Sequence, residues 1–252
     1  MLSVDKKKFE LSVKLFQHKG NTLITITPPE NISHVERSPI DLCCVIDTSL
    51  SMNEMVQIPN EKGIKESYEL SILDLVKHSM KTIIHSLNKN DRLAIVTFST
   101  HAKVRSNLTY MDEEGKNEFE NILLDINPEG STNLWDGLST GMDILNNIKD
   151  LSRLSALFLL TDGIPTEIPP HGHKKQLENY IKQKSLPAII NTFGFGYNLD
   201  SQLLLHIAKK GNGSFCFIPD GSFIGTVFIN SLSNLLSTVA TNLKLKIKFF
   251  QF

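Results

Sequence analysis

Hydrophobic and polar positions along this chain follow two alternating patterns. Short, nearly continuous apolar runs predict buried strands, here at 42–46, 92–99, 154–161, 188–195 and 214–218. Apolar residues three and four positions apart predict helices between these runs, at 67–87, 112–124, 134–148, 174–184, 200–209 and 224–239. This regular alternation predicts an α/β fold, a doubly wound, mostly parallel central sheet with helices on both faces.

The two ends of the chain show a different pattern, with apolar and polar residues alternating one by one. Segments 8–17 and 22–27 alternate in this way around a Gly-containing turn, which predicts a β-hairpin. Segment 243–252 alternates similarly, as a half-exposed strand does. We therefore expect a hairpin extension at 1–36, a central domain at 37–240, and a strand at 241–252 that pairs with the extension as a small β-layer. Because the chain stops inside that strand, further domains of a longer chain are possible.

The segment between Met52 and Ser67 is longer and more polar than a tight turn from a strand to a helix. We expect a loop there, close to the first strand end of the central domain. An insertion without a role, which surface loops tolerate well, remains an equal alternative.

Charge and composition exclude several classes of function. The 252 residues carry a formal net charge of −1, which gives no electrostatic reason to expect nucleic acid or an anionic membrane as a partner. No apolar run is long enough for a membrane span, and the charged N-terminus lacks the apolar core of a signal peptide. Cys43 and Cys44 are neighbours in a strand and point to opposite faces, so we expect reduced, buried thiols and a cytoplasmic protein.

Oxygen-bearing side chains occur at the ends of three predicted elements. Asp47, Ser49 and Ser51 follow the first buried strand, Thr132 lies in a loop before a helix, and Asp162 ends the strand at 154–161. Loops at the carboxyl ends of the strands share one crevice in an open parallel sheet, so these side chains could meet. Hard cations such as Mg²⁺ prefer oxygen ligands, and these three loop tips contain neither Cys nor His.

Each of the three stretches also has a purely structural interpretation. The Asp and Ser side chains after the first strand could form a turn or cap a helix. Thr132 could cap the helix that follows it, and Asp162 with Gly163 could form a plain turn. The order and context of all five positions together favour a metal site.

These five positions resemble the metal-ion-dependent adhesion site (MIDAS) of the von Willebrand factor type A (VWA) domain. That site has the form DxSxS, then a distant Thr, then a distant Asp before Gly, and the likeness extends over roughly residues 38–240. The resemblance implies a Rossmann-like fold with an edge antiparallel strand, and a bound Mg²⁺, with Mn²⁺ or Ca²⁺ possible. It further implies that Ser49 and Ser51 bind the ion directly, Thr132 directly or through water, and the two Asp residues mostly through water.

Such a site predicts a module that binds a partner protein through a divalent cation, with an Asp or Glu of the partner completing the coordination. A metal-assisted hydrolase or phosphoryl-transfer enzyme is the alternative, but we expect no enzyme because the loop tips supply no separate general base or nucleophile. A scaffold domain with a vestigial site is a third possibility. Leu50 departs from the family pattern, in which Gly is frequent, and should leave coordination intact unless its backbone requires a positive φ.

Overall fold

The computed structural model describes residues 12–27, 37–59, 65–148, 150, 152–219, 223–238 and 245–246. The chain divides into two compact units, one of Met1–Ser38 with Ser237–Phe252 and the other of Pro39–Leu236. In the first unit, β1 (Ser12–His18) and β2 (Asn21–Thr27) form the predicted antiparallel hairpin. Lys19 and Gly20 both have positive φ, of 47° and 79°, the combination that a two-residue hairpin turn requires. The predicted pairing of 241–252 with this hairpin lies largely outside the described residues, so it stays a prediction.

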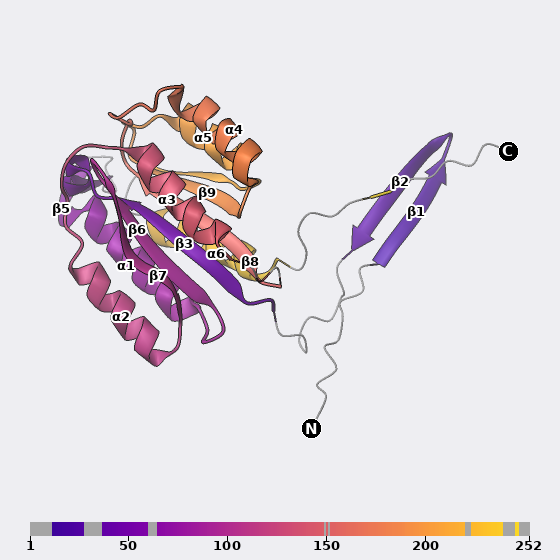
Figure 1. The fold of residues 1–252 in the computed structure, drawn as a ribbon, viewed down its shortest axis with the longest axis horizontal. Coiled ribbons are helices and arrows are strands. Elements are labelled where there is room, and N and C mark those ends of the chain that lie inside the picture. The colour runs from indigo at the N-terminus through magenta and orange to yellow at the C-terminus, as the bar shows by residue number, and fades with distance from the viewer. Residues whose placement is uncertain are drawn as a thin grey trace. The chain divides into compact units, whose positions relative to one another are not determined.

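The second unit is built on a six-stranded sheet with the strand order β10-β9-β8-β3-β6-β7 (Figure 1). Its strands are β3 (Ile40–Asp47), β6 (Arg92–Phe98), β7 (Ala102–Tyr110), β8 (Leu154–Thr161), β9 (Ile189–Phe195) and β10 (Phe215–Ile218). All neighbouring strands run parallel except β6 and β7, which pair antiparallel at one edge. The predicted doubly wound, mostly parallel sheet is confirmed.

Helices cover both faces of this sheet, as the alternating pattern predicts. One face is covered by α1 (Ile72–Ser86), α2 (Glu113–Leu124) and α6 (Ile224–Leu236). The other is covered by α3 (Leu134–Asn146), α4 (Gly172–Lys184) and α5 (Ser201–Lys210). The adjacent Cys43 and Cys44 face these two layers separately, are fully buried and form no disulfide, as predicted. Burial raises the pKa of the Cys43 thiol to about 12, so the thiol is protonated and unreactive.

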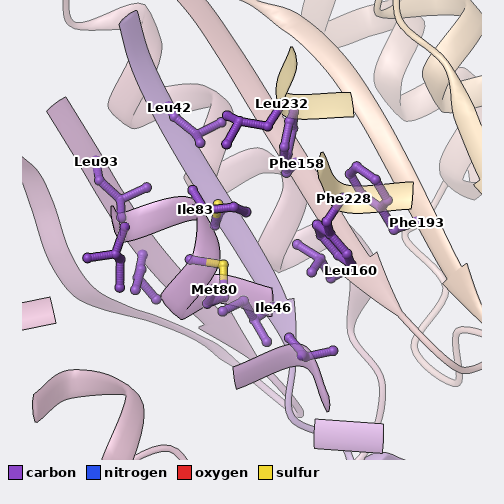
Figure 2. Close-up of a cluster of buried hydrophobic side chains, with 14 of the residues drawn as sticks. Leu42, Ile46, Met80, Ile83, Leu93, Phe158, Leu160, Phe193, Phe228 and Leu232 are labelled. Atoms are coloured by element: carbon purple, nitrogen blue, oxygen red, sulfur yellow. The ribbon is translucent and has the colours of Figure 1, made fainter. Parts of the chain in front are cut away.

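Aromatic side chains fill the space between the sheet and α6 (Figure 2). Phe193 on β9 lies with its ring centroid 5.0 Å from Phe158 on β8 and 4.6 Å from Phe228 on α6. All three rings are fully buried. This stack fixes the last helix on the sheet beside β9. In the described part of the chain, no helix is both long enough and apolar enough to cross a membrane.

The segment after the first strand differs from its prediction. In place of a loop up to residue 67, β4 (Met55–Pro59) and β5 (Lys65–Ser71) pair as an antiparallel hairpin, and α1 begins only at Ile72. Ile72 N–H donates to the Glu54 carbonyl at 3.0 Å, which brings the base of the hairpin back to the first strand end. The hairpin is held by backbone hydrogen bonds, which form without the apolar alternation that sequence patterns detect.

Ser71 begins α1 with a reciprocal cap that fixes the helix start. Its Oγ accepts from Asp74 N–H at 3.1 Å, and the Asp74 carboxylate accepts from Ser71 N–H at 3.0 Å. We expect Ser71→Ala to lower the free energy of unfolding by about 1 kcal/mol, measured by urea denaturation. Ser86→Ala at the other end of α1 is the control, because the exposed Ser86 hydroxyl only donates to Thr82 C=O. Equal losses in the two variants would contradict the capping role.

Candidate metal centre

The predicted site lies at the point where the order in which strands are added to the sheet reverses. The chain runs from β3 to β6 and β7 on one side, then returns to β8 on the other side of β3. Because β3 and β8 are parallel neighbours, the loops after them leave from the same edge. This is the position at which open α/β sheets bind ligands.

Hydroxyl and carboxylate groups from these two loops form a continuous hydrogen-bonded chain. The Oγ atoms of Ser49 and Ser51 are 3.1 Å apart, and Ser51 Oγ donates to Asp162 Oδ1 at 2.8 Å. Ser51 and Asp162 are 111 residues apart in the sequence. Ser49 precedes the short 3₁₀ helix η1 (Leu50–Asn53), but its side chain makes no capping bond there. The hydroxyl of Ser49 is therefore part of the cluster and not of a helix cap.

Thr132 joins the same cluster from the third loop. A methyl group built on Gly163 would lie 3.6 Å from Ser51 Oγ and 3.8 Å from Thr132 Oγ1, so both hydroxyls border the same space. Thr132 N–H donates to Thr166 Oγ1 at 2.9 Å, and Thr166 N–H donates to the Thr132 carbonyl at 3.0 Å. The N-cap of α3 is Asn133, whose side chain accepts from Asp136 N–H at 3.2 Å. Thr132 therefore does not cap that helix.

Four of the five predicted residues line one hollow of about 420 Å³: Ser49, Ser51, Thr132 and Asp162. Asp47 lies below them and is fully buried. Its Oδ1 accepts from Ser49 N–H at 2.8 Å, and its Oδ2 accepts from Thr161 Oγ1. Asp47 thus orients the loop that carries the two serines, and the turn interpretation of this stretch holds for its backbone.

Some residues of the site were not predicted from the sequence, and three of them bear on its chemistry. Thr161 holds Asp47, Glu54 lines the hollow, and Tyr197 reaches it from the loop after β9. Only Thr161 has a signal in the sequence, because it precedes Asp162 at the end of an apolar run that pairs with β3.

Leu50 fits the site without backbone strain. It lies in η1, and among the described residues other than glycine only Lys19, Ser185 and Asn212 have positive φ. The absence of glycine at this position therefore leaves the serine loop undistorted. The Leu50 side chain is 65% exposed and points apolar surface at the hollow, which it lines.

The surroundings of Asp47 and Asp162 disfavour the charged form of both carboxylates. Burial, together with the charge of Asp47, raises the pKa of Asp162 to about 7, although the hydrogen bond from Ser51 opposes the rise. Burial also raises the pKa of Asp47, against the hydrogen bonds from Thr161 and Ser49. Within the described ranges, no Lys, Arg or His pairs with either carboxylate. Two buried carboxylates among neutral hydroxyls form a donor set that fits a hard divalent cation.

The raised pKa of Asp162 should remove part of the stability of the metal-free protein as pH rises from 4 to 7. Because the folded-state pKa of Asp162 is above its ordinary value of 3.8, its stabilising contribution is complete below that value and is lost up to about pH 7. In EDTA, we expect the melting temperature of Asp162→Asn, relative to that of the wild type, to rise between pH 4 and pH 7. The raised pKa of Asp47 acts in the same direction, so some slope remains in the variant. Identical slopes would show that Asp162 is not perturbed.

A known domain family matches the part of the chain that carries this cluster. The model of the von Willebrand factor type A domain matches residues 42–164, which include all five predicted positions. By this match, residues 42–164 belong to the von Willebrand factor type A domain family. VWA domains are commonly protein-interaction modules.

Several known proteins resemble the chain over most of its length. The uncharacterized protein YfbK of Escherichia coli is 27% identical over 214 residues, which cover 83% of this chain and 33% of YfbK. A von Willebrand factor type A structure from Catenulispora acidiphila has a TM-score of 0.67 at 20% identity, covering 85% of this chain and 45% of its own. Proximal thread matrix protein 1 from the mussel byssus, solved with a zinc-occupied MIDAS motif, has a TM-score of 0.58 at 20% identity. The likeness covers 79% of this chain and 46% of the mussel protein chain. This chain thus spans about a third of YfbK and under half of each solved chain.

Proposed function

We propose that this VWA domain binds one divalent cation at the cluster of Asp47, Ser49, Ser51, Thr132 and Asp162, and through it an acidic residue of a partner protein. The observation that carries the proposal is the hydrogen-bonded chain of oxygens at the floor of an open hollow. Its carboxylates have no cationic partner among the described residues. A cation would neutralise buried negative charge that the fold otherwise leaves uncompensated.

The residues divide into two roles in this proposal. The hydroxyls of Ser49, Ser51 and Thr132 are neutral donors that leave the positive charge of an ion largely intact. Asp47 and Asp162 hold these hydroxyls and the serine loop in place through the bonds described above. When bound, the ion supplies positive charge and a free coordination position for an outside carboxylate.

Mg²⁺ is the proposed ion, and Mn²⁺ or Ca²⁺ would accept the same oxygen donors. The zinc-occupied MIDAS motif of the mussel protein supports a divalent cation at this position of the fold. We also propose a cytoplasmic location, supported by the free cysteines. The larger size of YfbK supports further domains in a longer natural chain.

The residues around the hollow support binding over catalysis. Of the described residues that line it, only Glu54 and Asp162 are ionisable at ordinary pH, and no His, Cys or Lys is among them. Asp162 is already committed to Ser51, so a hydrolase would depend on Glu54 as its general base. Turnover of generic phosphoesters or peptides in Mg²⁺, lost in Glu54→Gln, would favour the enzyme instead.

Calorimetric titration of Mg²⁺ into wild type and Ser51→Ala tests the cation site. We expect Ser51→Ala to bind Mg²⁺ at least about 10-fold more weakly, because the variant loses a donor and the bond that holds Asp162. Ser131→Ala is the matched control, since Ser131 also lines the hollow but its hydroxyl donates to Thr100 Oγ1 at 3.1 Å and not to a residue of the cluster. Equal affinities in Ser51→Ala and wild type, or no binding by either, would contradict the proposal.

A further inference from the structure

We propose that the partner segment bound at this hollow presents a single Asp or Glu flanked by large apolar side chains. This inference rests on the cation site proposed above and specifies the kind of partner that the site accepts. It comes from the apolar and charged side chains around the oxygen cluster, none of which is needed to hold an ion.

Three exposed apolar side chains form what we call the apolar rim: Leu50, Ile164 and Tyr197. They are 65%, 54% and 76% exposed, and all three line the hollow that the oxygen cluster opens into. They come from the loops after three different strands, β3, β8 and β9. Large exposed apolar residues that gather around one polar site are typical of a binding surface, whereas single scattered ones are not.

The aromatic part of the rim continues onto the neighbouring strand. The ring of Tyr197 meets that of Phe217 on β10 edge-on, with centroids 5.4 Å apart and an interplanar angle of 69°. Phe217 is itself 41% exposed. Gly196, with a φ of 72°, makes the turn that carries Tyr197 out of β9. An apolar side chain that flanks a docked carboxylate would therefore find apolar surface to contact.

The charges around the hollow select for one acidic residue and not several. Among its described lining residues there is no Lys, Arg or His that could pair with a second acid. Glu54 lines the hollow, and its negative charge would repel a second acidic group. Lys103 does not line the hollow, and its ammonium group forms an ion pair with the Glu129 carboxylate at 2.5 Å. Acidic runs, phosphorylated segments and nucleic acids are therefore poor occupants, and an isolated acid between apolar residues is complementary.

Selection from a random displayed peptide library, carried out on the full 252-residue chain in Mg²⁺ and in EDTA, tests this inference. We expect the peptides enriched only in Mg²⁺ to carry one Asp or Glu with large apolar residues at adjacent positions. A synthetic peptide of the selected sequence should bind Ile164→Ser and Tyr197→Ser each about 10-fold more weakly than wild type. Leu124→Ser and Ile229→Ser are the controls, since these residues are 69% and 52% exposed on α2 and α6.

The outcomes separate this inference from the cation site itself. Three results would overturn the inference if calorimetry shows that Mg²⁺ binds: enrichment of acidic runs, enrichment of an acid between polar residues, or enrichment of no peptide. The cation site would remain in each case. Absence of Mg²⁺ binding would overturn the proposed function. If the rim variants also bind Mg²⁺ more weakly, their loss of peptide affinity no longer tests the rim alone. The composition of the peptides selected by the wild type then decides whether the inference holds.

Discussion

The Asp47→Asn variant is expected to bind Mg²⁺ about 10- to 100-fold more weakly than wild type, the loss typical of a group that orients metal ligands. In the same variant, the metal-free protein should melt at the wild-type temperature or above it. Asn has nearly the same shape as Asp and can still accept from Ser49 N–H, while its amide can donate to Thr161 Oγ1. The substitution removes a buried charge whose pKa burial has raised, so folding without metal becomes easier.

Calorimetry and thermal melting in EDTA measure these two effects on the same preparation. Glu129→Gln is the control, because it removes a nearby negative charge that is paired with Lys103 outside the hollow. Its Mg²⁺ affinity should stay close to that of the wild type. A large fall in melting temperature of metal-free Asp47→Asn would show that Asp47 is a structural residue, which contradicts its proposed role in cation binding.

Asp41→Ala should lower the free energy of unfolding by about 3–5 kcal/mol. We expect no larger loss of stability from the substitution of any other charged residue. Asp41 is fully buried on β3, opposite Arg92 on β6. Arg92 donates to it through Nε and Nη2 at 2.8 and 2.7 Å, and Arg153 Nε at 2.6 Å. The Arg153 side chain is only 7% exposed, so removing Asp41 leaves a buried guanidinium group without its carboxylate.

Urea denaturation of Asp41→Ala measures this cost. Glu129→Ala is the control, since the Glu129 and Lys103 side chains are about half exposed, at 49% and 52%, and such pairs contribute no more than about 1 kcal/mol. The double variant Asp41→Leu with Arg153→Met should recover part of the loss, because it removes the unpaired charge as well. A loss in Asp41→Ala no larger than in Glu129→Ala would mean that the charge network contributes little.

Much of the fold could be predicted because its central strands are buried on both faces. The β8 segment is a nearly continuous apolar run for this reason, and its predicted bounds agree with the structure. The β4–β5 hairpin could not be predicted, because backbone pairing holds it and no apolar period marks it. The start of α1 was placed at 67 instead of 72 because the Ser71–Asp74 cap, and not the apolar spacing, sets it.

The candidate site was predictable in its polar residues and not in its apolar ones. Asp47, Ser49 and Ser51 share one short stretch, and each of the other two positions ends or precedes a recognisable element. Ile164 and Tyr197 resemble any apolar loop residue in the sequence, and only the folded chain places them around the same hollow. Their loops follow β8 and β9, and the order of strands in a sheet is not a property of local sequence.

Anomalous diffraction from crystals of the protein grown with Mn²⁺ tests the central claim most directly, because it locates the bound ion itself. We expect one strong Mn²⁺ peak between the hydroxyls of Ser49, Ser51 and Thr132, absent in crystals of Asp47→Asn. Bound Mn²⁺ located only elsewhere, with this cluster empty, would contradict the proposed cation site.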